Sequence, residues 1–336
     1  MALPLTPIDR RLSIAPMMDW TDRHCRYFHR LLAPRALLYT EMMHSGAVLH
    51  GDRARHLAFN PAEHPVDLPL GGSDPTALVR SAAIGADRGY DEINLNCGCP
   101  SERVQRGSFG ACLMREPELV AACVAAITAV VGGSIPVTVK CRIGVDDSED
   151  YAFLAQFVAK VAGAGCRTFV VHARKAWLRG LSPKQNRELP PLRYEQVHRL
   201  KHEFPELTIV LNGGLRSPGI AGKQSRQVDG VMIGREAYEN PWSLISFEAT
   251  LLGSPPARTS RHDIVATMTE YAAAQATAGV PIRAISRHML GLFNGVPGAR
   301  AWRRRLAMAE PNEGPGVLTG ALRLVADDKD GAREAA

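Results

Sequence analysis

Eight short runs rich in β-branched and other apolar residues are spread over the first 235 residues of the chain. They are LSIAPMM (12–18), ALLYTEM (36–42), VDLPLGG (66–72), EINLNCG (92–98), PVTVKCRIG (136–144), TFVVHA (168–173), TIVLNGG (208–214) and GVMIGR (230–235). Between them lie segments with apolar residues at helical spacing, several of which end at glycine. Strand followed by helix, eight times, predicts a parallel (β/α)8 TIM barrel, α/β in class, with strands buried on both faces. A doubly wound open sheet is the alternative, but the first strand lacks the G-x-G-x-x-G turn typical of that fold.

The pattern changes after about residue 250. A Pro- and Ser-rich segment, LGSPPARTS (252–260), is followed by apolar residues at helical spacing and by no strand-like run. We therefore expect a barrel domain over residues 1–250 and a small helical domain over residues 251–336. Within the barrel, SPGIAGKQSRQ (217–227) carries two glycines and a proline, and it is expected to be a poor helix.

Composition adds two expectations. The net charge of +6 is compatible with a polyanionic partner but does not require one. The chain has no export signal and no apolar stretch near the roughly 20 residues of a membrane helix, so its seven cysteines are expected to be free thiols in a cytoplasmic, monomeric protein. No metal site is expected, because Cys97 and Cys99 are one residue apart and no second C-x-x-C pair exists.

In a barrel, the polar residues that end the strands gather at one mouth and are the candidate site. Strands seven and eight end in Asn212-Gly213-Gly214 and Gly234-Arg235, where backbone N–H groups and one guanidinium could bind a phosphate. Lys140 ends strand five, and it could be a Schiff-base nucleophile, an ion-pair partner, or a cation beside a reduced flavin. The glycines could also serve only to turn tight loops.

The longest connections follow strands four and six. Strand four leads into Cys99 and a loop of about 15 residues that could act as a lid, and Cys99 could be a nucleophile, a general acid or an inert thiol. Strand six leads into a loop with Trp177 and many cations, and a second basic stripe lies on ARAWRRRLAM (299–308). Such charges are often a solvated face, yet two basic patches with an aromatic residue also suit RNA.

These segments together resemble the tRNA-dihydrouridine synthase family, and in particular its A subfamily. The resemblance rests on APMM, EINLNCGCPS, GSFGACLM, VTVKCRIG, HARKAWLRGLSPKQNR, LNGG, DGVMIGREAYENP and NGVPGARAWRR, which cover almost the whole chain. It implies bound FMN, reduced by NADPH, and hydride transfer from flavin N5 to uracil C6 in the D-loop of tRNA, by resemblance at positions 20 and 20a.

The resemblance also implies roles for individual residues. Cys99 matches the general acid that protonates uracil C5, and Asn96 matches a residue that meets the target uridine. The residues matching flavin ligands are Pro16, Met17, Met18, Lys140 and His172 around the ring, with Asn212, Gly213, Gly214, Gly234 and Arg235 at the phosphate. Those matching the tRNA-binding surface are Arg174, Lys175, Lys184, Arg187, Arg300 and Arg303.

Two residues depart from the family pattern. Pro69 stands where the family usually has a glutamine that hydrogen-bonds the flavin, so weaker flavin retention is expected. Cys97 replaces a residue that is typically aliphatic, and it is expected to be buried. Three other functions remain open from the sequence: a small-molecule flavin oxidoreductase on the same barrel, a Schiff-base aldolase using Lys140, and an RNA-binding module without a cofactor.

Overall fold

The computed structural model describes residues 8–101, 104, 107–133, 135–148, 150–253, 259–310 and 313–326. Eight parallel strands close into a barrel, because β1 pairs with both β2 and β9 and β2 pairs with β4. They are β1 (Leu12–Ile14), β2 (Leu37–Tyr39), β4 (Val66–Gly71), β5 (Glu92–Asn96), β6 (Val137–Arg142), β7 (Thr168–His172), β8 (Thr208–Asn212) and β9 (Gly230–Ile233). Each lies within one of the eight runs predicted from the sequence, so the fold class is confirmed. The two-residue β3 (Met43–His44), which pairs with the end of β4, was not predicted.

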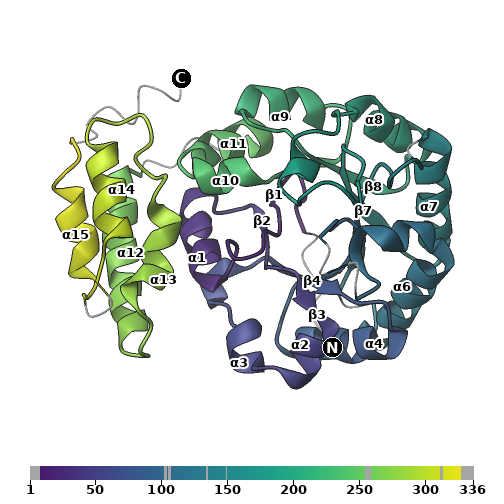
Figure 1. Cartoon of the computed structure of the whole chain (residues 1–336), viewed down its shortest axis with the longest axis horizontal. Helices are drawn as coiled ribbons and strands as arrows, with labels where there is room; N and C mark the ends of the chain where they lie inside the picture. Colours follow the sequence, from purple (N-terminus) through teal and green to yellow (C-terminus); the bar gives the residue numbers. More distant parts are fainter. Residues whose placement is uncertain are drawn as a thin grey trace.

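Helices surround the barrel (Figure 1). The outer layer is α1 (Arg23–Leu32), α4 (Pro75–Asp87), α6 (Pro117–Val131), α7 (Tyr151–Gly163), α8 (Tyr194–Glu203), α9 (Pro218–Ser225) and α11 (Ser243–Leu252). Shorter helices lie in the loops: α2 (Ser45–His50), α3 (Arg53–His56), η1 (Pro61–Glu63), η2 (Gly110–Arg115), η3 (Gln185–Arg187) and α10 (Arg235–Glu239).

The prediction that residues 217–227 form a poor helix is wrong, because α9 spans Pro218–Ser225. Ser217 caps it by accepting a hydrogen bond from the Ile220 N–H, and Pro218 takes the first helical position, where its missing N–H is not needed. A Cβ at Gly222 would lie 3.1 Å from Thr250 Cγ2, so the glycine allows α11 to pack closely. Tertiary packing and a good cap therefore outweigh the low helix propensity.

The C-terminal helices pack beside α1 (Figure 1). They are α12 (Arg261–Ala276), α13 (Ile282–Ser286), η4 (Arg287–Met289), α14 (Ala299–Ala307) and α15 (Gly316–Leu322). Their apolar faces are buried, as predicted, by residues such as Met268, Met289, Trp302 and Leu318. Most of the segment expected to link the two domains, 254–258, lies outside the described residues, and the boundary at residue 250 stays a prediction. No described helix combines the length and apolar character needed to cross a membrane.

The inside of the barrel is partly polar at its N-terminal end. Glu92 accepts hydrogen bonds from Tyr39 (3.0 Å) and Thr138 (2.8 Å) and pairs with Arg10. Asp67 is fully buried nearby, and neither of its carboxylate oxygens accepts a hydrogen bond from a described residue. This end of the barrel is thus filled, so the open mouth lies at the other end of the strands.

Candidate active site

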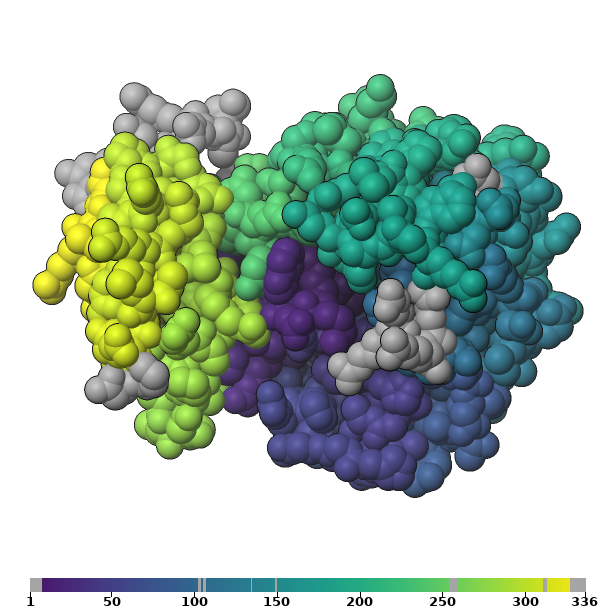
Figure 2. Space-filling model, in the orientation of Figure 1, coloured from purple at the N-terminus to yellow at the C-terminus, as the bar shows by residue number. Residues whose placement is uncertain are grey.

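A cavity of about 1660 Å³ opens at the C-terminal ends of the barrel strands. Figure 2 shows that purple N-terminal residues lie at the centre of the viewed face, between the barrel and the C-terminal helices. The cavity brings together thirteen of the site residues predicted from the sequence: Pro16, Met17, Met18, Asn96, Cys99, Lys140, His172, Arg187, Asn212, Gly213, Gly214, Gly234 and Arg235. Arg174, Lys175, Lys184, Arg300 and Arg303 do not line it.

Cys99 lies half-buried in a turn directly after β5, and Asn96 organises this turn. The Asn96 Oδ1 atom accepts hydrogen bonds from the backbone N–H groups of Gly98 and Cys99, each at 3.1 Å. The Cys99 carbonyl in turn accepts from the Ala111 N–H at 2.9 Å. Because Oδ1 of the Asn96 side chain already accepts these two hydrogen bonds, only the Nδ2 group of that side chain is left to meet a substrate. Part of the loop beyond, at 102, 103, 105 and 106, lies outside the described residues, so the predicted lid stays a prediction.

Arg142 also holds this turn, and the sequence pattern did not single it out. Its guanidinium is buried and donates from Nε to the Gly98 carbonyl at 2.9 Å and from Nη1 to the carbonyls of Lys175 and Asn186, both at 3.0 Å. It thereby joins the Cys99 turn to the long loop after β7. The only sequence signal was an arginine two residues after Lys140 at the end of an apolar strand.

Cations dominate the electrostatics of the cavity around Lys140. Burial, together with the charge of nearby Arg142, lowers the pKa of Lys140 to about 8. Burial and the charges of Arg142 and Lys140 hold the pKa of His172 well below its ordinary value, so this imidazole is neutral at pH 7. Among the described residues, no carboxylate pairs with the Lys140 ammonium. The region is therefore suited to an anion.

The loops after β8 and β9 contain the glycines and the arginine that were predicted to bind a phosphate. Gly213 and Gly214 have φ of +113° and +68°, which L side chains rarely adopt, and a Cβ at Gly214 would lie 2.4 Å from Leu192 Cδ1. Asn212 donates from Nδ2 to the Met232 carbonyl at 2.8 Å and so links β8 to β9. Arg235 is not free, because it pairs with Glu188 at 2.5 Å, and an anion would have to compete with this carboxylate.

These features fit FMN. Gly213, Gly214 and Gly234 line the cavity at the strand ends, and Lys140 supplies a cation inside it. The buried Nδ1 atom of His172 has no hydrogen-bond partner among the described residues, which is unusual for a buried ring nitrogen unless a ligand provides one. Pro69 lies in β4 opposite Asn94 and does not line the cavity, so its effect on flavin binding stays a prediction. Cys97 is buried, as expected.

The basic loop after β7 is cross-linked by hydrogen bonds of a second residue that the sequence pattern did not single out. The buried Asn186 accepts from the Trp177 N–H at 2.7 Å and donates to the carbonyls of Trp177 (2.9 Å) and Leu181 (3.1 Å). Lys175 lies over the Trp177 ring, 4.2 Å from its centroid. Arg174 donates to the Pro190 carbonyl. Lys184 is exposed at the start of η3.

The second basic stripe lies on α14. Arg300 and Arg303 are exposed, whereas Trp302 between them is buried on the opposite face. Arg303 donates to Asn294 Oδ1 at 2.8 Å, and the Trp302 indole donates to the Met289 carbonyl at 3.0 Å. The stripe is thus held firmly on the C-terminal helices, outside the cavity.

Comparison with known proteins gives a consistent result. The family model described as "Dihydrouridine synthase (Dus)" matches residues 13–322. The chain is 56% identical over 306 residues to a tRNA-dihydrouridine(20/20a) synthase from Xanthomonas campestris pv. campestris, with 91% of this chain and 90% of the relative covered. It is 54% identical over 310 residues to the protein of that name from Shewanella oneidensis (92% of each chain) and 53% identical over 322 residues to that from Escherichia coli O6:H1 (95% and 96%).

Proposed function

This chain belongs to the dihydrouridine synthase family, and we propose that it is an A-subfamily enzyme that reduces uridines 20 and 20a in the D-loop of tRNA to 5,6-dihydrouridine. The observation that carries the proposal is the cavity in which Cys99, Lys140, His172 and the glycine loops meet. Family membership favours a flavin partner for Lys140 over a Schiff base, although its lowered pKa suits either role. A cytoplasmic location and a monomeric state stay predictions.

The residues around the cavity would hold FMN. Pro16, Met17 and Met18 would lie against the ring, Lys140 would face its N1/C2 edge, and His172 would contact it. The phosphate would be held by Asn212, Gly213, Gly214, Gly234 and Arg235. When bound, FMN supplies the hydride, taken from NADPH, that adds to uracil C6.

Cys99 would supply the proton for the other carbon of the reduced bond. As the hydride reaches C6, the electron pair of the C5–C6 double bond moves towards C5 and O4, and the Cys99 thiol donates its proton to C5. The thiolate that remains takes a proton from solvent before the next turnover. Asn96 would fix the turn that carries Cys99, and its Nδ2 group would meet the uracil.

The basic surface would hold the tRNA. Arg174, Lys175, Lys184 and Arg187 would contact its backbone at one side of the mouth, and Arg300 and Arg303 would contact it from the C-terminal helices. A cavity at the strand ends is reached by a nucleotide only after that nucleotide leaves the folded RNA, as base-modifying enzymes generally require.

The decisive experiment separates the two half-reactions in a Cys99→Ala variant loaded with FMN. We expect anaerobic bleaching of the flavin by NADPH at the wild-type rate, while dihydrouridine formation in unmodified tRNA falls by about 100-fold or more. A wild-type protein that binds no FMN, or that forms no dihydrouridine, would contradict the proposed function. Equal loss of both half-reactions would contradict the role of Cys99.

The role of the second basic stripe is tested by Arg300→Gln and Arg303→Gln. We expect weaker tRNA binding and a slope of log Kd against log salt that is smaller by about 1 for each phosphate that the variant no longer neutralises. Arg323→Gln is the matched control, since Arg323 is also exposed on the C-terminal helices but lies at the end of α15. A slope unchanged in all three variants would make the stripe an ordinary solvated face.

A further inference from the structure

We propose that Asp22 is a positioning residue that fixes the C-terminal helices, and with them the basic stripe of α14, relative to the loop that lines the flavin site. The inference rests on the proposed function only for its tRNA readout. The Asp22 carboxylate lies at the start of α1 and contacts two parts of the chain, α1 and the C-terminal helices.

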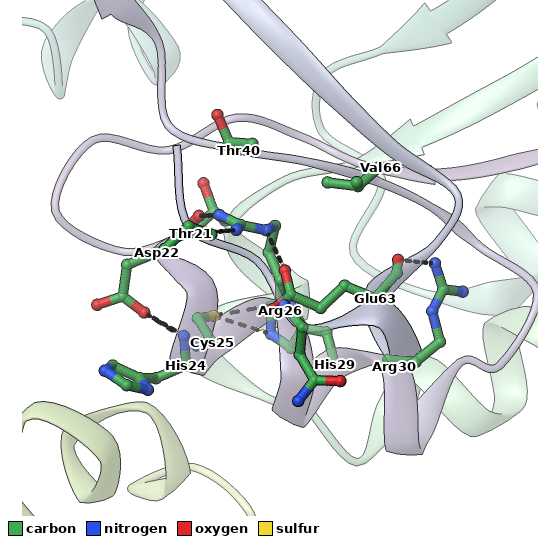
Figure 3. A network of polar contacts seen from close by, with 12 residues as sticks. Thr21, Asp22, His24, Cys25, Arg26, His29, Arg30, Thr40, Glu63 and Val66 are labelled. Atoms are coloured by element: carbon green, nitrogen blue, oxygen red, sulfur yellow. Dashed lines mark hydrogen bonds and ion pairs between the residues drawn. The ribbon is translucent and has the colours of Figure 1, made fainter. Parts of the chain in front are cut away.

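One Asp22 oxygen caps α1. Oδ1 accepts hydrogen bonds from the backbone N–H groups of His24 (2.9 Å) and Cys25 (3.0 Å), and Figure 3 shows these residues together at this end of the helix. Both oxygens also meet the C-terminal helices: Oδ2 accepts from Arg287 Nη2 at 2.6 Å, and His288 Nε2 lies 3.0 Å from Oδ1 and 3.1 Å from Oδ2. Burial alone would raise the pKa of Asp22, but the hydrogen bond and charge of His288, with the hydrogen bonds from the Cys25 N–H and Arg287, hold this pKa below its ordinary range.

Asp22 also belongs to the loop that carries the flavin-lining residues. The Thr21 hydroxyl accepts from the Met17 N–H at 2.9 Å and donates to the Met17 carbonyl at 3.2 Å. The Trp20 N–H donates to the same carbonyl at 3.1 Å. A displacement of Asp22 is therefore transmitted to Met17 through a compact turn of six residues, 17–22.

A second connection closes a ring of contacts. The buried His288 presents Nδ1 to the Tyr238 hydroxyl at 3.2 Å, and Tyr238 belongs to α10, which begins at the proposed phosphate loop. Tyr238 in turn stacks on Trp20, with centroids 4.2 Å apart and planes 13° from parallel. Three segments that are far apart in the sequence thus meet around Asp22, and two of them adjoin proposed flavin-binding loops, those after β1 and β9.

The contacts of Asp22 with Arg287 and His288 form a junction, and this junction continues into the basic stripe. Met289 follows His288, is fully buried, and accepts the indole hydrogen bond of Trp302. Trp302 lies on α14 between Arg300 and Arg303. A chain of specific contacts therefore runs from the flavin loop through Asp22, His288 and Met289 to the side chains proposed to hold tRNA. Through these contacts Asp22 holds the basic stripe in place relative to the loop that carries Met17.

Asp22→Asn is the informative variant. Asparagine caps a helix as well as aspartate does, so α1 keeps its cap, but the charge that holds Arg287 and His288 is removed. The chain should still fold, because α1 and α12 keep the Tyr27–Tyr271 stack (4.0 Å) and the His24–Tyr271 hydrogen bond (2.8 Å). Asp150→Asn is the matched control, since Asp150 also caps a helix, α7, and forms no ion pair with another described residue.

Two measurements test the proposal in the full chain. Hydrogen–deuterium exchange followed by mass spectrometry should show faster exchange over residues 286–292 in Asp22→Asn, with no change in Asp150→Asn. Affinity for unmodified tRNA should fall by about tenfold in Asp22→Asn, the size of a typical coupling between sites. The direction is diagnostic, because removal of a carboxylate would by itself strengthen the attraction for a polyanion.

Unchanged exchange over 286–292 would overturn the junction. Faster exchange together with unchanged or tighter tRNA binding would overturn its role in positioning the basic stripe. The exchange measurement needs neither FMN nor tRNA, so the junction can stand even if the wild-type protein forms no dihydrouridine. That outcome would refute the proposed function and not the contacts of Asp22.

Discussion

The buried guanidinium of Arg142 gives the sharpest test of how the site is held together. Three backbone carbonyls, those of Gly98, Lys175 and Asn186, accept hydrogen bonds from this one side chain, which is 4% exposed. Burial, with a contribution from neighbouring arginines, lowers its pKa to about 10, so it remains charged at pH 7. Arg142→Met keeps a side chain of similar length and removes every donor.

The expected loss of stability follows from these contacts. Hydrogen bonds to a charged group contribute about 1.5–3 kcal/mol each, which gives roughly 4.5–9 kcal/mol for the three. Arg142→Met also removes the free-energy cost of burying a charge, which offsets several kcal/mol of that sum. We therefore expect Arg142→Met, which leaves three carbonyls without their donors, to lower the free energy of unfolding by about 3–5 kcal/mol. Arg142→Lys keeps the charge but lacks the planar fork, and it should lose about 1–3 kcal/mol.

The measurement is urea denaturation at pH 7 in the absence of FMN, so that cofactor binding does not add to the stability. Arg115→Met is the control, because Arg115 is exposed and its pair with Asp146 at 2.7 Å is a surface ion pair worth less than about 1 kcal/mol. A loss below about 1 kcal/mol in Arg142→Met would refute the reasoning. In the loaded enzyme, the loosened Cys99 turn should slow uridine reduction more than flavin reduction.

Two further predictions concern the barrel interior and the phosphate loop. Burial and the charge of Glu92 raise the pKa of Asp67 well above its ordinary value, so the folded state favours the protonated form and loses stability as pH rises above about 3.9. Asp67→Asn should therefore raise the free energy of unfolding by more than about 1 kcal/mol at pH 7 and by much less at pH 3.5. An equal gain at both pH values in urea titrations would contradict this prediction. Gly214→Ala should weaken FMN binding by about tenfold or more in a flavin fluorescence titration, because the left-handed φ and the nearby Leu192 both oppose a Cβ. Gly219→Ala is the control and should bind FMN normally, because no atom lies within 4 Å of the added Cβ.

The local pattern of apolar and polar residues was sufficient to predict the barrel strands and to bring many of the candidate site residues to one mouth. Short apolar runs located all eight barrel strands, and the barrel rule then placed Cys99, Lys140 and His172 at one mouth. Propensity failed at α9, where a cap and a close helix contact at Gly222 decide the conformation. The two-residue β3 is too short to carry a periodic signal.

Residues that act through long-range contacts were beyond the sequence pattern. Arg142 joins carbonyls 44 and 33 residues away, and Asp22 meets Arg287 across 265 residues. An arginine after a strand and an aspartate before a helix look ordinary in the sequence, since each is common at such a position. Only the closed barrel and the docked C-terminal helices give them their partners.

The same long-range arrangement explains why the mouth of the barrel suits an anion. Lys140 and Arg142 come from one strand, and Arg187 comes from the loop after β7, yet the charges of both arginines lower the pKa of Lys140. Their mutual repulsion opposes folding, and the fold tolerates it because Arg142 makes three hydrogen bonds to the backbone. Burial and this repulsion together lower the pKa of Lys140, and an anionic ligand beside it would favour the ammonium form and raise this pKa.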